Sequence, residues 1–562
     1  MEKMARFILS KTSGNSWIIG ILLLAAFLRL YRIQDYMTFL GDEGRDVLVA
    51  YNILHGNLTL LGPTASVGGF FLGPIYYYFM APFLLAFNYN PVGPAIMVAL
   101  FGIATVFLIY KVGVEFFGKG VGLIAAFLYS ISPLVIAYSR SSWNPNLMPF
   151  FSLLSLYVLY KAVAENKIKL FILCGFLLGI AMQLHYLTIF LGVIAVVYIL
   201  LTRLIGYDPV KVIKDYSYVL LGFLIGWSPF LAFEIRHNLP NIKSIISFVF
   251  NSGDTGGSSN FFTTIYNVFF RLFGRLVTNF PPPEQVALGA HPNIALWYHA
   301  TLILGIVSIA VLIYKLIKNF KDKDQFQKIS LFIVWLLFGI GLFGFYKKSI
   351  YDYYFGFMFP LPFLLVGLTI SSLYGNFQKL IFIRHSGEDP SADGDDSRIR
   401  PVSSRTERFW TSQNDGKWEL LGKVLAVGIF AVLAWINLQG IPFRYAANRQ
   451  LEQVEKISRF VYDKSEGKPY NFALSTGGNS DHAYRYFLTV WDKPPVTIEN
   501  PKEDPKRTTV TDQLVVVCEK HPCFPLGNSL WEIAGFGRAE IVGEWDVSVV
   551  KVYKLKHYKG KD

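Results

Sequence analysis

The sequence has few charged residues. Asp, Glu, Lys and Arg make up 16% of its 562 residues, whereas soluble domains contain about 25%. It has only three cysteines, and no Cys/His spacing typical of a structural zinc site. Hydrophobic residues instead make up 53%, with long apolar runs recurring from Trp17 to Ala434. Runs of roughly 18 or more apolar residues can cross a bilayer. The sequence therefore predicts an α-helical polytopic membrane protein and excludes a soluble globular chain.

The net charge of +13 does not indicate a nucleic-acid ligand. Lys and Arg lie mainly in short loops between the apolar runs, which is the pattern that sets membrane topology. Lys3, Arg6 and Lys11 place the N-terminus in the cytoplasm as an uncleaved anchor. We therefore expect a first helix at about 17–33 and an outer loop at 34–92.

Loop charges predict about eleven crossings. The segment 71–90 contains two prolines and three consecutive tyrosines. It cannot be a single crossing without reversing the polarity of every later loop. We expect it to be a juxtamembrane element at the outer interface, where Tyr is favoured. An ordinary spanning helix is the alternative.

The chain divides by composition into a membrane part and a polar tail. We expect a transmembrane module at 1–375, a flexible cytoplasmic linker at 376–420 and a last transmembrane helix at 421–438. The tail, 440–562, should be a small extracytoplasmic α+β domain, with a helical pattern over 451–461 followed by strands in "QLVVVCE", "AEIVGEW" and "VSVVKVYKL". Cys518 and Cys523 either form a disulfide there or remain unpaired thiols.

A cluster of charges follows the first apolar run. The stretch "TFLGDEGRDVLVAY" contains Asp42, Glu43, Arg45 and Asp46 at the start of a helical pattern. Carboxylates at a helix N-terminus are often caps, and we favour that interpretation for Asp46. For Asp42 and Glu43, at a membrane surface, a chemical role is as well supported as capping.

Other polar residues are predicted on the same outer face. A carboxylate pair facing several cations is typical of a site that handles phosphate, because cations hold the phosphate and a carboxylate can deprotonate a hydroxyl. Each cation alone could instead be an interfacial anchor. The predicted phosphate-binding residues are Arg140, Arg236, Lys347 and Lys348, and we expect substrate contacts from Arg45, Tyr76, Asn144, His185, Tyr351 and Tyr354.

The ordered set of motifs resembles the GT-C glycosyltransferases. It comprises the acidic pair, the amphipathic "DVLVAYNILHGN", "LGPIYYYF", "YSRSSWNPN", "MQLHYL" and a late Lys–Tyr loop, over roughly 17–375. The protein O-mannosyltransferase and lipid A aminoarabinose transferase branches are the most similar. The resemblance implies that Asp42 is the catalytic base and that Glu43 supports it. It also implies that Lys347 and Lys348 meet the donor phosphate beside Tyr351 to Tyr354.

Two positions depart from those families. They usually have an acidic residue where this chain has Asn144, which can hydrogen-bond a sugar but cannot act as a base. They have a metal-binding Glu or a His just before a proline, where this chain has Leu72 and Gly73 before Pro74. The resemblance therefore predicts no cofactor and identifies no metal ligand in this chain. A bound divalent metal is the less favoured alternative.

The predicted function is sugar transfer from a polyprenyl-phosphate donor, with inversion at the anomeric carbon. The acceptor would be a lipid, glycan or protein on the extracytoplasmic face of the plasma membrane, and membrane lipids would surround the spans. The polar tail would recognise the acceptor. A non-enzymatic flippase or transporter of lipid-linked sugars is one alternative, and a surface-polysaccharide ligase or polymerase is the other. A flippase should tolerate Asp42→Asn.

Overall fold

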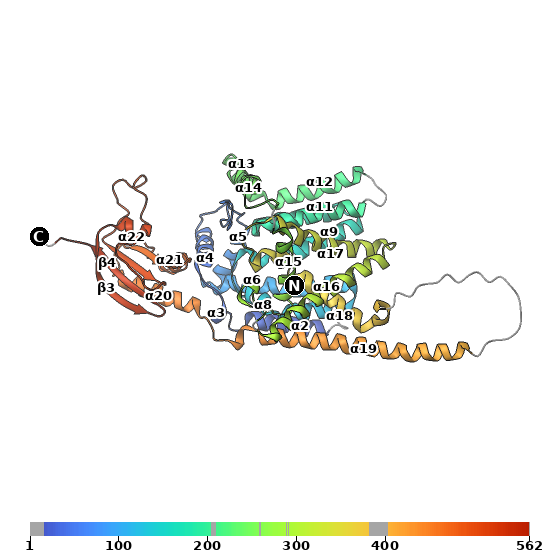
Figure 1. Ribbon diagram of the computed structural model, residues 1–562. Coiled ribbons are helices and arrows are strands. Elements are labelled where there is room, and N and C mark those ends of the chain that lie inside the picture. The colour runs from blue at the N-terminus through green and yellow to red at the C-terminus, as the bar shows by residue number, and fades with distance from the viewer. Residues whose placement is uncertain are drawn as a thin grey trace.

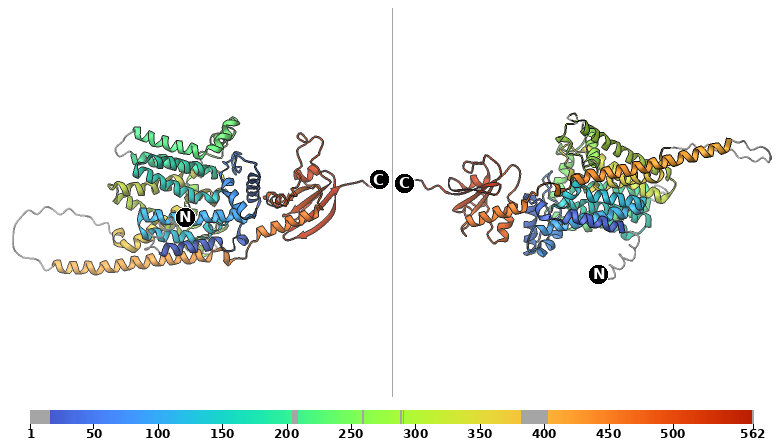
Figure 2. Two further views of the ribbon diagram at one scale, coloured as in Figure 1. Left: turned by 180° about the vertical axis from the view of Figure 1, so that it is seen from behind. Right: turned by 90° about the horizontal axis from the view of Figure 1, so that it is seen from below.

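The chain folds into a helical bundle with a small α/β domain at one end (Figure 1). The computed structural model describes residues 16–203, 209–257, 260–287, 289, 291–381 and 403–560. Long helices run side by side along the bundle, and α4 (Gly41–Leu54) lies between the bundle and the C-terminal domain in both Figure 1 and Figure 2. We call the end of the bundle at which α4 and the C-terminal domain lie the domain end.

Among the described residues, six helices are long and apolar enough to span a membrane. They are α6 (Val92–Phe117), η1 (Asn144–Leu147) with α9 (Met148–Glu165), η2 (Tyr186–Thr188) with α11 (Ile189–Arg203), α16 (Pro292–Lys318), α17 (Lys323–Gly341) with η4 (Leu342–Phe345), and the last part of α19 (Ser403–Gln439).

Two bent pairs raise the number of candidate spans to eight. They are α12 (Pro209–Gly226) with α13 (Ser228–Arg236), bent by 74°, and η5 (Asp352–Met358) with α18 (Pro360–Ile381), bent by 60°. Prolines at the start of α13 and α18 cause the breaks, because proline lacks the N–H that would continue the helix. The protein is thus a multi-span membrane protein with six to eight candidate spans in its described part.

Four apolar helices are shorter: α2 (Ser16–Leu30), α5 (Ile75–Ala86), α7 (Lys119–Ile131) and α10 (Ile168–Leu184). The predicted eleven crossings would require three of them to span, so that number stays a prediction. Helix α5 has 12 residues, about 18 Å at 1.5 Å per residue, which is less than the ~30 Å of a bilayer core.

Shorter elements surround α4 at the domain end. These are α3 (Ile33–Tyr36), α8 (Pro133–Tyr138), α14 (Pro240–Phe250), α15 (Phe261–Gly274), η3 (Pro283–Gln285) and η6 (Pro442–Arg444). Two of them, α15 and η3, carry Arg271 and Glu284, which are described below.

The predicted linker at 376–420 is helical at both ends. Helix α18 continues to Ile381 and α19 already begins at Ser403. The backbone thus remains helical beyond the apolar part, where i→i−4 hydrogen bonding does not require apolar side chains. The middle of the predicted linker, 382–402, lies outside the described residues.

The C-terminal domain is a four-stranded sheet with three helices. Its elements are α20 (Gln450–Lys464), β1 (Asn471–Ser475), α21 (His482–Val490), β2 (Gln513–Cys518), α22 (Trp531–Phe536), β3 (Ala539–Val547) and β4 (Val550–His557). The strand order is β1-β2-β4-β3, with β1 parallel to β2 and the other pairs antiparallel. The predicted helix and three of the strands are confirmed.

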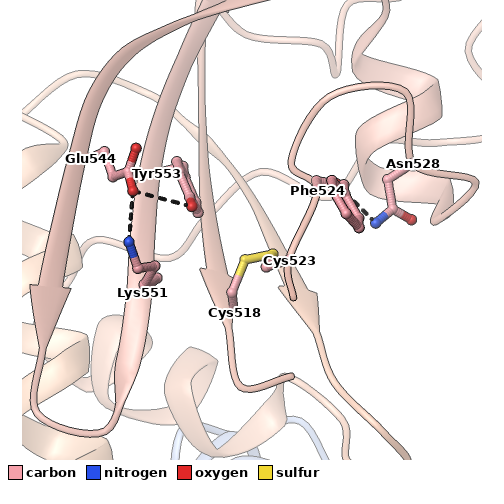
Figure 3. The surroundings of a disulfide bond; sticks show 7 residues. All are labelled: Cys518, Cys523, Phe524, Asn528, Glu544, Lys551 and Tyr553. Atoms are coloured by element: carbon pink, nitrogen blue, oxygen red, sulfur yellow. Dashed lines mark hydrogen bonds and ion pairs between the residues drawn. A yellow bond between two sulfur atoms is a disulfide. The ribbon is translucent and has the colours of Figure 1, made fainter. Parts of the chain in front are cut away.

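A disulfide joins Cys518, the last residue of β2, to Cys523 (Figure 3). It closes a short loop directly beside the sheet. Lys551 and Glu544 pair across the neighbouring β3–β4 hairpin at 2.8 Å. Of the two alternatives left open by the sequence, the structure therefore has the disulfide.

The C-terminal domain contacts α4 through two glycines. A Cβ atom at Gly41 would overlap Ser480, and one at Gly44 would overlap the backbone of Ala483 at the start of α21. The Gly41 N–H also donates to Asn479 Oδ1 at 2.8 Å. Glycine thus lets the two helices approach at backbone distance, which fixes the domain against the helix that carries the acidic pair.

We predict that Gly44→Ala weakens this contact. The added methyl group must displace the α21 backbone, which should destabilise the protein by about 1–3 kcal/mol. Thermal unfolding of purified protein in detergent would measure the change. Gly20→Ala is the control, because a Cβ at Gly20 would meet no atom within 4 Å. Equal melting temperatures for both variants would contradict the prediction.

Candidate active site

Helix α4 begins with a carboxylate cap. The side chain of Glu43 accepts a hydrogen bond from the Leu40 N–H at 3.1 Å, which satisfies a donor that the helix leaves unpaired. It also accepts from Thr38 Oγ1 at 2.6 Å and from Ser141 Oγ at 3.1 Å. Glu43 is buried. It therefore stabilises the start of α4, and its predicted role in supporting Asp42 stays a prediction.

Arg45 joins an exposed carboxylate to a buried one. Its Nη1 lies 2.9 Å from Asp42 Oδ1 and its Nη2 lies 2.7 Å from Asp46 Oδ1. The Asp42 side chain is 56% exposed, whereas that of Asp46 is fully buried. Asp46 is thus more than a surface helix cap. Burial raises its pKa to about 7, although the Arg45 charge acts in the opposite direction.

A small polar pocket of about 140 Å³ lies beside this triad. Four of the predicted site residues line it, although they come from distant parts of the chain. Its lining consists of Asp42, Arg45, Pro63, Thr64, Ala65, Ser66, Leu72, Trp143, Asn144, Pro145, His185, Tyr186 and Tyr353. We call it the polar pocket.

Asn144 and His185 are fixed on its wall. Asn144 Nδ2 donates to the Leu184 carbonyl at 2.6 Å, and His185 Nδ1 accepts from the Leu187 N–H at 3.3 Å. The His185 ring stacks on Tyr186, with ring centres 4.6 Å apart. Both predicted residues therefore face the pocket from a loop between two apolar helices.

The predicted aromatic residues of η5 divide between the pocket and the surface. Tyr354 is buried and its hydroxyl lies 3.2 Å from Ser66 Oγ, whereas Tyr351 is exposed and stacks on Tyr353. Tyr353, which the sequence analysis included only within the range Tyr351 to Tyr354, lines the pocket and contacts Trp143 edge-on, with ring centres 4.5 Å apart.

A buried ion-pair cluster holds η5 in place. Asp352 pairs with Arg271 Nη1 at 2.8 Å and with Arg275 Nε at 2.9 Å, and Arg271 also pairs with Glu284 at 2.6 Å. None of these residues was among the predicted site residues. Their only signal was the four-residue spacing of the two arginines, which places both on one face of α15.

A much larger cavity lies beside the contact between the start of α4 and the C-terminal domain. Its volume is about 1110 Å³, and we call it the interdomain cavity. The bundle contributes Thr38, Leu40, Gly41, Asp42, Glu43, Ala137, Tyr138, Ser141, Trp143 and Asn146; the domain contributes Gln450, Gln453, Val454, Ile457, Thr476–Ser480, Tyr484, Glu519, Val549 and Val550. Asp42 and Trp143 line both this cavity and the polar pocket.

A third, apolar cavity of about 900 Å³ lies along α10, α11, α12 and α14. We call it the apolar groove. Its lining includes Gly192, Val196, Leu220 and Ile246, and at Thr188 it comes within two residues of Tyr186 in the polar pocket. The apolar groove and the polar pocket therefore both draw lining residues from η2.

The predicted cations do not gather at the polar pocket. Arg140 donates to the carbonyls of Leu28 at 2.9 Å, Arg29 at 3.2 Å, Tyr31 at 2.9 Å and Arg32 at 3.0 Å. Its planar guanidinium thus caps the end of α2.

Arg236 is exposed at the end of α13, and Lys347 and Lys348 are exposed before η5. Lys348 Nζ lies 3.2 Å from Asp254 Oδ2. Tyr76 is buried, with its hydroxyl 2.8 Å from Ser142 Oγ. Within the described part of the chain, no three His, Cys, Asp or Glu side chains converge as metal ligands do.

Residues 72–233 match a protein-family model described as dolichyl-phosphate-mannose-protein mannosyltransferase. "Putative mannosyltransferase YycA" of Bacillus subtilis is 26% identical over 227 residues, which are 38% of this chain and 31% of that protein. "Putative mannosyltransferase YkcB" of the same organism is 26% identical over 163 residues, which are 29% of this chain and 23% of that protein. The chain thus aligns with less than a third of either relative.

The fold resembles that of ArnT from Cupriavidus metallidurans. The structure of ArnT bound to undecaprenyl phosphate aligns with a TM-score of 0.59 over 96% of this chain and 98% of ArnT, at 12% identity. The apo structure aligns with a TM-score of 0.56 at 13% identity. These matches confirm the predicted resemblance: the chain has an ArnT-like fold, and part of it is similar to the mannosyltransferase family model and to two putative mannosyltransferases.

The raised pKa of Asp46 leads to a prediction about stability and pH. Between about pH 4 and about pH 7 the unfolded chain has lost this proton while the folded protein retains it. Raising the pH through that window therefore favours unfolding. Asp46→Asn cannot titrate, so its melting temperature relative to the native chain should rise between pH 5 and pH 8. A difference that does not vary with pH would contradict this assignment.

Proposed function

We propose that this protein transfers a sugar from a polyprenyl-phosphate donor to an acceptor hydroxyl, with Asp42 as the general base. The observation that carries the proposal is that Asp42 lines two cavities at once. A base for glycosyl transfer must reach the acceptor hydroxyl while that hydroxyl faces the anomeric carbon. Asp42 is exposed enough to do so, and Arg45 holds its carboxylate.

In this mechanism the sugar and its phosphate occupy the polar pocket and the acceptor occupies the interdomain cavity. The acceptor oxygen forms a bond to the anomeric carbon as its proton passes to Asp42. The bond from that carbon to the phosphate oxygen breaks, and the electron pair leaves with the lipid phosphate. Attack from the face opposite the phosphate inverts the anomeric centre.

Arg45 is the cation that we assign to the donor phosphate. It lines the polar pocket, and a guanidinium matches phosphate oxygens in pairs. Lys347 and Lys348 remain candidates for an outer contact because they precede Tyr351 to Tyr354. Arg140 is left out because it does not line the polar pocket and its guanidinium caps α2.

The apolar groove supports a lipid-linked donor. A polyprenyl chain requires a long apolar surface close to the site of its phosphate. The groove supplies such a surface, and its lining residue Thr188 belongs to the same short helix, η2, as Tyr186 of the polar pocket. Binding would remove apolar surface from contact with other lipids or water, at roughly 25 cal/mol per Å² where water is displaced.

We further propose that the domain end faces the extracytoplasmic side, with α5 at the interface and eleven crossings. The Cys518–Cys523 disulfide supports this orientation, because disulfides persist in oxidising compartments. The eleven crossings would consist of the eight candidate spans together with α2, α7 and α10.

We predict that Asp42→Asn lowers sugar transfer by at least about 100-fold, the usual effect of losing a general base. Turnover of several polyprenyl-phosphate sugars by protein in nanodiscs would measure the loss. Asp35→Asn is a matched control, because Asp35 also pairs with an arginine three residues away, Arg32, at 2.7 Å. An unchanged melting temperature would show that the variant is folded. Full activity of Asp42→Asn would refute the role of the base.

We predict that Gly192→Phe selectively impairs long-chain donors. A side chain at Gly192 would meet open space and project into the apolar groove. It should raise the KM for a long polyprenyl donor by about tenfold and leave a short-chain analogue unaffected. Gly20→Phe, also in open space but on α2, is the control. Equal effects on both donors would argue against a lipid-binding groove.

A further inference from the structure

The interdomain cavity has one wall from the bundle and one from the C-terminal domain. On the bundle side it includes Asp42 and the aromatic residues Tyr138 and Trp143. On the domain side it includes Glu519 and the amide side chains of Gln450 and Gln453. At about 1110 Å³ it exceeds the size of most small-molecule sites. Its occupant is therefore larger than one sugar ring.

The charged side chains that line the interdomain cavity are all acidic. Three carboxylates line it, those of Asp42, Glu43 and Glu519, and among its described lining residues there is no Lys, Arg or His. A phosphate or carboxylate group would meet like charge here without a cation to pair with, which costs binding energy. The cavity therefore disfavours an anionic acceptor.

The polar side chains of the interdomain cavity can form hydrogen bonds with sugar hydroxyls. Side-chain amides both donate and accept, carboxylates accept strongly, and a sugar hydroxyl can do both. Aromatic side chains add flat apolar surfaces for the faces of sugar rings. The lining of the apolar groove contains far fewer polar groups than that of the interdomain cavity, so a lipid chain is better matched to the groove.

We propose that the interdomain cavity binds a neutral carbohydrate chain as the acceptor, and that Glu519 accepts hydrogen bonds from its hydroxyls. This inference rests on the proposed function for the role of Asp42, but the binding itself does not require catalysis. The C-terminal domain then determines which acceptor is used, and the bundle supplies the donor and the base.

Glu519 is well placed for this task. It directly follows Cys518, so the disulfide closes the loop in which it lies. Its N–H donates to the Ser475 carbonyl at 2.9 Å, and its Oε1 accepts from the Tyr484 hydroxyl at 2.7 Å. Asn479 Nδ2, 3.3 Å away, links it to the loop that contacts α4. The carboxylate is thus oriented before a ligand arrives, which lowers the entropy cost of binding.

Binding can be tested without the donor. Saturation-transfer NMR on the full chain in nanodiscs would use maltotetraose, cellotetraose and mannotetraose, a 6-phosphorylated maltotetraose and a Ser/Thr-rich peptide. We expect a neutral tetrasaccharide to bind more tightly than the phosphorylated one or the peptide. Preferential binding of the peptide or the phosphorylated sugar would overturn the proposal, as would binding of none of the probes.

Glu519→Gln should raise the KM for the neutral acceptor by roughly tenfold, the effect of losing one charge-assisted hydrogen bond. Hydrolysis of the donor by water, measured without acceptor, should not change, because Glu519 is absent from the polar pocket. Glu540→Gln is the control, being an exposed glutamate on β3 that does not line the cavity.

Glu519→Lys separates recognition from a structural role. Reversing the charge should shift the preference between phosphorylated and neutral tetrasaccharides by about tenfold or more towards the phosphorylated one. A structural defect alone would weaken both equally, and that result would overturn the inference. Absence of any donor turnover in the native chain would refute the proposed function instead, and the NMR result would still test the binding.

Discussion

The arrangement of the candidate active site depends on the guanidinium of Arg45. It bonds to the exposed carboxylate of Asp42 and to the buried carboxylate of Asp46. A buried carboxylate is costly unless it is paired, so Asp46 requires Arg45 to remain where it is. Arg45 in turn limits where Asp42 can point. The buried Asp46 therefore orients the exposed Asp42 through Arg45, within a single helical turn.

Helix α4 is also held by contacts on two sides, one to the bundle and one to the C-terminal domain. Glu43 closes its N-terminus against Thr38 and Ser141, while Gly41 and Gly44 bring the C-terminal domain to backbone distance. A helix held on both sides cannot rotate without breaking buried polar contacts. Asp42 consequently stays at the boundary between the polar pocket and the interdomain cavity.

Two cavities of different chemistry meet at this helix, and a third lies along α10, α11, α12 and α14. The apolar groove suits a lipid chain, the polar pocket contains the Arg45 cation, and the interdomain cavity contains carboxylates and amides. In the proposed reaction, this separation would give the lipid, phosphate and hydroxyl groups of the substrates the different surroundings that they require. Each group would find partners of matching polarity only in its own cavity.

Local patterns determined much of this protein from the sequence alone. Long apolar runs predict membrane helices because each must satisfy its own backbone in lipid. Short strand-like runs in 513–557 predict three of the four strands. The stretch around Asp42 was identifiable because four charges in five residues are unusual at the end of an apolar run.

Only the tertiary structure decided what distant residues do. Arg140 looks like a phosphate ligand in sequence but caps a helix more than 100 residues away, and Glu519 reaches the cavity of Asp42 from the far end of the chain. The physical reason is that hydrophobic periodicity and capping act between near neighbours, whereas the partner of a buried charge is chosen by packing across the whole molecule.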